Sequence, residues 1–225
     1  MLKIGHRGAA GYAPENTLAS FQKALELGVD AIEFDVHVCK TGEVMVIHDE
    51  TVKRTTDGRG AVAHMSFSEL RELDAGGGEK IPTLEEVLDL IDKKVVMHIE
   101  LKGLHTATEV AQIIERYIKE KGWRREHFLV SSFSVPELKK FRHVAPDIDT
   151  GLLVHGSLQG KLKRTKDFGC VSINPESAFV TKRLVRGAHE KGLKVFVWTL
   201  DDPKKIEKIK ALGVDGIFSN YPDRL

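Results

Sequence analysis

Three carboxylic acids lie inside segments of the chain that are otherwise apolar. Glu33 and Asp35 interrupt the run from Ala31 to Val36, and Glu100 lies near the end of the run from Val95 to Leu101. A buried carboxylate costs free energy unless a cation or a hydrogen-bond donor compensates its charge. Carboxylate oxygens are also the ligands that Mg2+ and Ca2+ prefer. We therefore expect these three residues to bind one divalent cation, Mg2+ or Ca2+; the alternative is that each pairs with an internal lysine or arginine.

Two histidines, His6 and His48, are candidates for proton transfer beside that cation. Histidine is the side chain whose unperturbed pKa lies near neutrality, so one ring can accept a proton while the other donates one. We expect both to be catalytic rather than ordinary hydrogen-bonded core histidines, and the sequence leaves open which of them is the base. By comparison, we interpret five other histidines as ordinary: His37, His64, His98, His143 and His189.

Three further residues are candidates for binding the substrate. Arg7 offers a fork of donors and Lys102 a point charge, and both would hold a phosphate. The alternative, which is strongest for Lys102, is that they balance the charge of the carboxylates. Trp198 is either an apolar wall for the carbon skeleton of a substrate or a packing residue of the core.

Short apolar runs rich in β-branched residues recur along the chain and alternate with segments of helical periodicity. Eight such runs in about this length favour closure into a (β/α)8 TIM barrel, in which reactive residues occupy the C-terminal ends of the strands. No Gly-x-Gly-x-x-Gly follows the first run, so dinucleotide binding has no support. The expected strands are residues 2–4, 31–36, 95–101, 128–130, 151–154, 171–173, 195–198 and 216–218.

The second strand is expected to form a hairpin, because the run from Val44 to Ile47 follows it with no room for a helix. A two-residue loop at Thr41-Gly42 would bring Asp35 opposite His48. Since side chains alternate along a strand, Glu33, Asp35 and His48 would then project from one face. Residues 50–82, rich in Thr, Asp and Gly, are expected to form a small insertion subdomain on a single barrel domain that spans residues 1–225.

Helix starts carry their own signals. Asn16 stands where a cap for the first helix is expected, Thr83 and Glu86 have the spacing of a capping box, and Asp202 precedes Pro203 at a first helical position.

Composition restricts the class of protein. The chain has 225 residues, of which 41% are hydrophobic, a proportion typical of globular domains. Its formal net charge is only +1, so no overall positive potential favours the binding of nucleic acid. Cys39 and Cys170 lack the spacing of metal ligands and are expected to be free thiols. Neither a signal peptide nor a membrane-spanning run is visible, so we expect a cytoplasmic protein without stable membrane association.

The ordered set of motifs resembles the glycerophosphodiester phosphodiesterase family. The resemblance spans nearly the whole chain. It departs from the family at the turn Cys39-Lys40-Thr41-Gly42 and at Asp201, which stands near a position often occupied by asparagine. The matching segments are His6-Arg7-Gly8, Pro14-Glu15-Asn16-Thr17, Phe21, Gly28-Val29-Asp30, Ile32-Glu33-Phe34-Asp35-Val36, His48-Asp49, Arg54-Thr55-Thr56, Glu100-Leu101-Lys102, Val197-Trp198-Thr199 and Gly213-Val214-Asp215-Gly216-Ile217.

The resemblance implies metal-dependent hydrolysis of a small-molecule glycerophosphodiester to sn-glycerol 3-phosphate and an alcohol. It implies general acid and base histidines at His6 and His48, and it matches Arg7 and Lys102 to phosphate-contacting positions. The nucleophile is either water or a hydroxyl of the substrate's own glycerol. Two other functions remain as alternatives: a lysophospholipase D-type phosphodiesterase, and a barrel that binds phosphodiesters without cleaving them. The preferred headgroup, the resident metal and the oligomeric state are left open.

Overall fold

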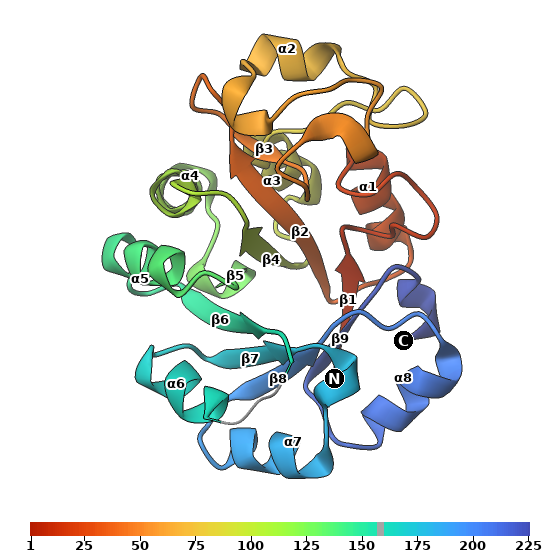
Figure 1. Ribbon diagram of the computed structural model, residues 1–225, viewed down its shortest axis with the longest axis vertical. Helices are drawn as coiled ribbons and strands as arrows, with labels where there is room; N and C mark the ends of the chain where they lie inside the picture. Colours follow the sequence, from red (N-terminus) through yellow and green to blue (C-terminus); the bar gives the residue numbers. More distant parts are fainter. Residues whose placement is uncertain (157–159) are drawn as a thin grey trace.

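Eight parallel strands close into a barrel in the computed structural model, which describes residues 1–156 and 160–225 (Figure 1). The first strand pairs in parallel with both the second and the last, and this double pairing closes the ring. A ninth, short strand pairs antiparallel with the second. The strands are β1 (Leu2–His6), β2 (Ala31–Val38), β3 (Val44–Val46), β4 (Val96–Leu101), β5 (Phe128–Ser132), β6 (Asp149–Val154), β7 (Ser172–Pro175), β8 (Lys194–Val197) and β9 (Gly216–Ser219).

Helices surround the barrel, as Figure 1 shows, and most of them pack apolar side chains against it. The helix at Phe67–Glu72 instead packs in a separate cluster outside the barrel. In α3, Leu84, Val87, Leu88 and Ile91 recur every three or four residues and all four are buried. After β9 a 3-10 turn, η5 (Pro222–Arg224), takes the place of a further helix. The helices are α1 (Leu18–Glu26), α2 (Phe67–Glu72), α3 (Leu84–Ile91), α4 (Thr106–Lys121), α5 (Val135–Val144), α6 (Lys161–Asp167), α7 (Lys182–His189) and α8 (Pro203–Lys210).

The expected barrel and its eight strands are confirmed, with boundaries that differ by a few residues. The capping box of Thr83 and Glu86 and the cap at Asp202 are also present. The prediction for α1 was wrong by one residue, because Thr17 is the cap and its hydroxyl accepts from the backbone N–H of Ser20. The preceding residue, Asn16, has a left-handed backbone with φ of 57° and directs its amide into the barrel.

The hairpin of β2 and β3 is present, but its predicted register is wrong by one residue. Cys39 and Glu43 face each other, and the loop between them has three residues that end at Gly42, whose φ is +104°. A three-residue loop with glycine in a positive-φ conformation is a common hairpin form. Asp35 consequently lies opposite Ile47, whose backbone N–H donates to its carbonyl oxygen at 3.0 Å.

The segment between β3 and α3 contains the 3-10 turns η1 (Val52–Arg54) and η2 (Val62–His64) and the helix α2. It packs around its own cluster of buried residues, which includes Val52, Val62 and Leu70, and it projects at the top of Figure 1. Its end returns along the outer edge of β3, where the backbone N–H of Val46 donates to the carbonyl oxygen of Pro82 at 2.8 Å. We call this segment, residues 47–83, the insertion.

Two findings bear on the environment of the chain. Cys39 and Cys170 are both free and buried. Among the residues described, none of the helices combines the length and the hydropathy needed to span a membrane.

Candidate active site

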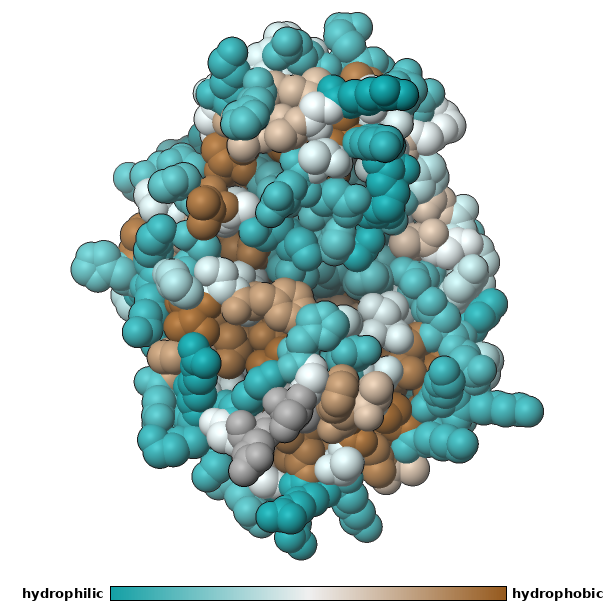
Figure 2. Space-filling model, viewed as in Figure 1, coloured by the Kyte–Doolittle hydropathy of each residue, from teal (hydrophilic) through white to brown (hydrophobic). Residues whose placement is uncertain are grey.

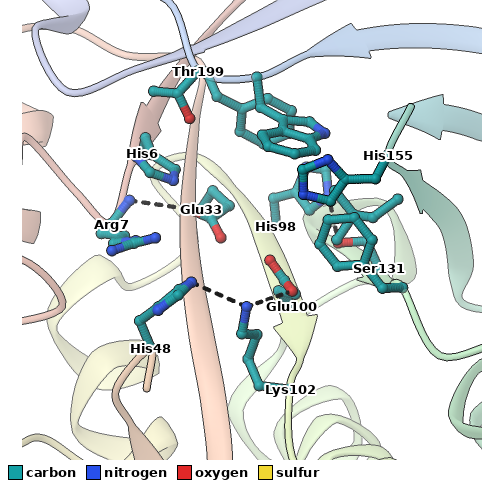
Figure 3. A pocket seen from close by; sticks show the side chains of 14 residues that line it. His6, Arg7, Glu33, His48, His98, Glu100, Lys102, Ser131, His155 and Thr199 are labelled. Carbon is teal, nitrogen blue, oxygen red and sulfur yellow. Dashed lines mark hydrogen bonds and ion pairs between the residues drawn. The ribbon is translucent and has the colours of Figure 1, made fainter. Parts of the chain in front are cut away.

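A cavity of about 310 Å3 opens at the C-terminal ends of the strands. In Figure 2 the same face is hollowed near its centre, with hydrophilic residues toward the insertion and hydrophobic residues on the opposite side. Figure 3 shows the side chains that converge on the cavity from strands distant in sequence. The lining residues are His6, Arg7, Glu33, His48, His98, Glu100, Lys102, Ser131, Phe133, Leu153, His155, Trp198, Thr199 and Phe218.

Strand register brings the three predicted metal-binding carboxylates together. Asp35 of β2 lies directly beside Glu100 of β4, and Glu33 lies two residues before Asp35 on the same strand. All three residues are buried, and each offers an oxygen within 4.8 Å of the others. Side chains two apart on a strand point the same way, which is why Glu33 and Asp35 share the inner face of the barrel.

Burial and mutual repulsion disfavour the ionised forms of Glu33 and Glu100. Burial, followed by the charges of Asp35 and Glu100, raises the pKa of Glu33 well above its ordinary value. Burial and the charge of Asp35 raise the pKa of Glu100 to about 8, although Lys102 opposes the shift. A divalent cation would relieve this repulsion, because it favours the ionised form of each ligand. The donor set therefore fits one hard divalent ion.

Arg7 and Lys102 lie in the cavity beside the carboxylates. Arg7 has a left-handed backbone with φ of 52°; its backbone N–H donates to Glu33 at 3.0 Å, and its Nε lies 3.4 Å from Asp35. The ammonium of Lys102 lies 3.1 Å from Glu100 and 3.0 Å from Nε2 of His48 (Figure 3). Both cationic side chains thus balance carboxylate charge, and both also line the cavity.

His6 is held by a chain of hydrogen bonds from the last strand. Its Nδ1 lies 2.8 Å from Oδ1 of Asn220, and the Nδ2 of Asn220 donates to Asp201 at 2.7 Å. Because Asp201 fixes the amide, Oδ1 is the acceptor, and the proton of neutral His6 sits on Nδ1. Burial and the charge of Arg7 lower the pKa of His6 to about 4. Its Nε2 is therefore unprotonated at neutral pH.

His48 is held in the same tautomer from the opposite side. Its Nδ1 lies 2.6 Å from Oδ1 of Asp49, an acceptor, so Nδ1 carries a proton. Its Nε2 faces Lys102 and the cavity. His48 therefore reaches the expected cavity although the hairpin register was predicted wrongly. It follows the end of β3, so its direction is not set by the alternation of side chains along that strand.

The far side of the cavity is an aromatic wall formed by Phe133, His155 and Trp198. The rings of Phe133 and His155 stack with centroids 5.6 Å apart, and Trp198 meets both edge to face. The indole Nε1 of Trp198 also donates to the carbonyl oxygen of Asn174 at 2.7 Å. Trp198 is thus at once a wall of the cavity and a packing residue of the barrel.

A model of the glycerophosphoryl diester phosphodiesterase family matches residues 6–224. The chain belongs to this family. A glycerophosphodiester phosphodiesterase from Caldanaerobacter subterraneus subsp. tengcongensis is 38% identical over 233 residues, which cover 100% of this chain and 96% of that protein.

Solved structures agree with this assignment to the phosphodiesterase family. An Oleispira antarctica phosphodiesterase, determined in complex with the product sn-glycerol-3-phosphate, has a TM-score of 0.91 at 31% identity and covers 98% of this chain and 93% of its own. A glycerophosphodiester phosphodiesterase from Agrobacterium tumefaciens has a TM-score of 0.86 at 31% identity and covers 100% of this chain and 98% of its own.

The structure brings together all eight predicted site residues of this phosphodiesterase-family chain, with Asp35 just beneath the cavity surface. Sequence reasoning treated His98 as ordinary, yet its Nε2 lies 3.0 Å from the hydroxyl of Ser131 and both line the cavity. Its position two residues before Glu100 on one strand was an available signal. Asn220 was also missed, although it directly follows β9 at the catalytic end of the barrel.

Proposed function

We propose that this chain hydrolyses glycerophosphodiesters to sn-glycerol 3-phosphate and an alcohol, with His6 and His48 as general base and general acid. The observation that carries the proposal is that two oriented histidines, three buried carboxylates and two cationic side chains, Arg7 and Lys102, gather at one cavity. A similar structure was determined with sn-glycerol-3-phosphate bound, which supports the same substrate class here.

His6 is proposed as the base. Its Nε2 is unprotonated at neutral pH because burial lowers the pKa of the ring to about 4. Asn220 holds Nδ1 at 2.8 Å and so aims Nε2 at the cavity. A hydroxyl whose proton passes to Nε2 becomes the nucleophile toward phosphorus.

His48 is proposed as the acid that protonates the leaving alkoxide. The carboxylate of Asp49 accepts from Nδ1 at 2.6 Å and so orients the ring with Nε2 toward Lys102 and the cavity. To act as an acid, His48 must carry a proton on Nε2. That nitrogen can then no longer accept the hydrogen bond from the Lys102 ammonium, which lies 3.0 Å away in this structure. A bound phosphate gives the Lys102 ammonium a new partner, so substrate binding itself releases Nε2 of His48.

Glu33, Asp35 and Glu100 would hold one divalent cation, Mg2+ or Ca2+. That ion would supply charge for the phosphoryl oxygens when bound. Arg7 contributes to the same task from the protein, because its guanidinium lies beside the carboxylates at the cavity surface.

The nucleophile is proposed to be a hydroxyl of the substrate's own glycerol. His6 takes its proton, the new P–O bond closes a cyclic phosphate, the bond to the alcohol breaks, and His48 protonates the departing oxygen. Water then opens the ring with the two histidines in exchanged roles. A substrate that lacks the neighbouring hydroxyl tests this step: it should not be cleaved, whereas direct attack by water would still cleave it.

The main experiment measures release of sn-glycerol 3-phosphate from glycerophosphocholine and glycerophosphoethanolamine with Mg2+ or Ca2+, and again in chelator. Activity that the chelator abolishes supports the proposal, and absence of product across substrates and metals would overturn it. Lysophosphatidylcholine in the same panel tests for cleavage that releases the headgroup from a lysophospholipid.

Substitution of either histidine tests their roles. His6→Ala and His48→Ala should each lower kcat by ~10² to 10⁴, the range for a lost general acid or base. His143→Ala is a matched control, because this histidine lies in α5 and does not line the cavity. Near-normal rates in both site variants would show that the assignment is wrong.

A further inference from the structure

We propose that Arg54, an arginine of the insertion, is a positioning residue. Through two carboxylates, Glu15 and Asp49, it orients the side chains of Arg7 and His48 for catalysis. This inference rests on the proposed function. Arg54 does not line the cavity, so it would act on the reaction only through the residues that it holds.

Arg54 grips both carboxylates with two pairs of hydrogen bonds. Nε and Nη2 donate to the two oxygens of Asp49 at 2.8 and 2.9 Å. Nη1 and Nη2 donate to the two oxygens of Glu15 at 2.8 Å each. A guanidinium has the planar fork needed for two such bidentate pairs at once, and a lysine ammonium does not.

Each carboxylate also accepts a hydrogen bond from a residue that lines the cavity. Oε1 of Glu15 also accepts from Nη1 of Arg7 at 2.8 Å. Oδ1 of Asp49 also accepts from Nδ1 of His48 at 2.6 Å. The bonds form one continuous arc, Arg7, Glu15, Arg54, Asp49 and His48.

The arc joins parts of the chain that barrel pairing alone does not hold together. Glu15 lies in the loop after β1, Asp49 follows β3, and Arg54 ends η1. Neither loop carboxylate belongs to a strand, so their side chains depend on local contacts for orientation. Arg54 supplies the contact that they share.

The charges in the arc favour its ordered form. Burial alone would raise the pKa of Glu15, but hydrogen bonds from Arg54 and the charges of Arg7 and Arg54 lower it to about 2. The hydrogen bond from Arg54 likewise lowers the pKa of Asp49. Both acceptors therefore stay ionised over the neutral range. Exposed single ion pairs contribute little to stability, and the effect expected here is on geometry at the cavity.

The test compares the full-length enzyme with Arg54→Met and Arg54→Lys, using kcat and KM for glycerophosphocholine and the affinity for sn-glycerol 3-phosphate by calorimetry. We expect Arg54→Met to lower kcat/KM by roughly 10- to 100-fold and to weaken product binding, because Arg7 and His48 lose their common support. Arg54→Lys should restore part of the activity, since it keeps the charge without the double fork.

A thermodynamic cycle separates positioning from direct contact. In the background Glu15→Gln plus Asp49→Asn, Arg54→Met should cost less than about twofold more, because the residues through which it acts are already changed. An undiminished effect in that background would overturn the proposal, since Arg54 would then act by another route.

Arg71→Met is the matched control for loosening of the insertion. Arg71 donates to the carbonyl oxygen of Ile81 near the end of the insertion and to the carboxylate of Glu86 in α3, and it does not contact the arc. It should leave kcat/KM within about twofold even where it lowers the melting temperature. Equal losses in Arg71→Met and Arg54→Met, or none in Arg54→Met, would overturn the positioning role. A wild-type protein that neither hydrolyses the diester nor binds the product would instead overturn the proposed function.

Discussion

His6 and Asn220 meet across the seam of the barrel, with Nδ1 of the imidazole 2.8 Å from Oδ1 of the amide. His6 ends β1, the first strand, and Asn220 follows β9, the last. β1 and β9 pair directly, so the contact exists only when the ring is closed. The proposed base is therefore oriented by the closure of the barrel itself.

Asn220→Leu should lower kcat by roughly 10²-fold, because Nδ1 of His6 loses the acceptor that fixes its tautomer and ring angle. The acidic limb of the kcat/KM profile should not move to higher pH, because the bond to Asn220 raises the pKa of His6. Asp201→Asn should cost less, since its amide oxygen still accepts from Nδ2 of Asn220. Steady-state kinetics over a pH series measures both, and an unchanged kcat in Asn220→Leu would contradict the orientation role.

Metal binding should stabilise the protein more at about pH 8.5 than at about pH 6. Without the ion, burial and the charge of Asp35 raise the pKa of Glu100 to about 8, so below that pH a proton occupies the carboxylate and competes with the metal. Thermal melting with Mg2+ or Ca2+ and with chelator measures the shift at each pH. Glu100→Gln should reduce the shift, and equal shifts at the two pH values would count against the carboxylate site.

His98 should make the fold sensitive to acid. Burial lowers its pKa to about 3, below the unfolded value of 6.5. Its contribution is complete above about pH 6.5 and is lost as the pH falls toward 3, because only the unfolded state then binds the proton. Between pH 7 and about 4.5, His98→Gln should lose less free energy of unfolding than wild type, by roughly 2 kcal/mol. Urea unfolding at both pH values provides the measurement, and parallel losses in the two proteins would refute it.

Gly8→Ala should destabilise the fold by about 2 to 4 kcal/mol. Gly8 has φ of +83°, and a Cβ there would contact the hydroxyl of Ser20 and lie 2.7 Å from its backbone carbon. Gly28→Ala is the matched control, because Gly28 also has positive φ, +69°, but open space around it, so only about 1 kcal/mol is expected. Chemical denaturation compares the two variants, and equal losses would show that the close approach to Ser20 is unimportant.

The fold could be predicted from the sequence because its signals are local. Each buried strand is a short β-branched run, and the carboxylates at Glu33, Asp35 and Glu100 stand out because charge is costly in such runs. The hairpin register could not be fixed in the same way. It depends on whether the loop has two or three residues, and Gly42 permits the longer form.

The supporting contacts of the site were beyond sequence reasoning for a different reason. Asn220 meets His6 from 214 positions away, and Arg54 meets Glu15 from 39 positions away. No periodicity links such pairs, because loops rather than strands or helices set their geometry. Arg54 belongs to a motif of the family resemblance, but its contacts and those of Asn220 become visible only once the barrel brings the loops to one end.

The contact between Val46 and Pro82 has a consequence for how freely the insertion can vary. β3 would otherwise expose a row of unpaired peptide groups, the kind of edge that recruits strands from other molecules. The returning chain, which also forms a bridge from Thr83 to Met45, seals that edge. A shortened insertion must therefore keep its last residues in register with β3, or the barrel gains a surface prone to self-association.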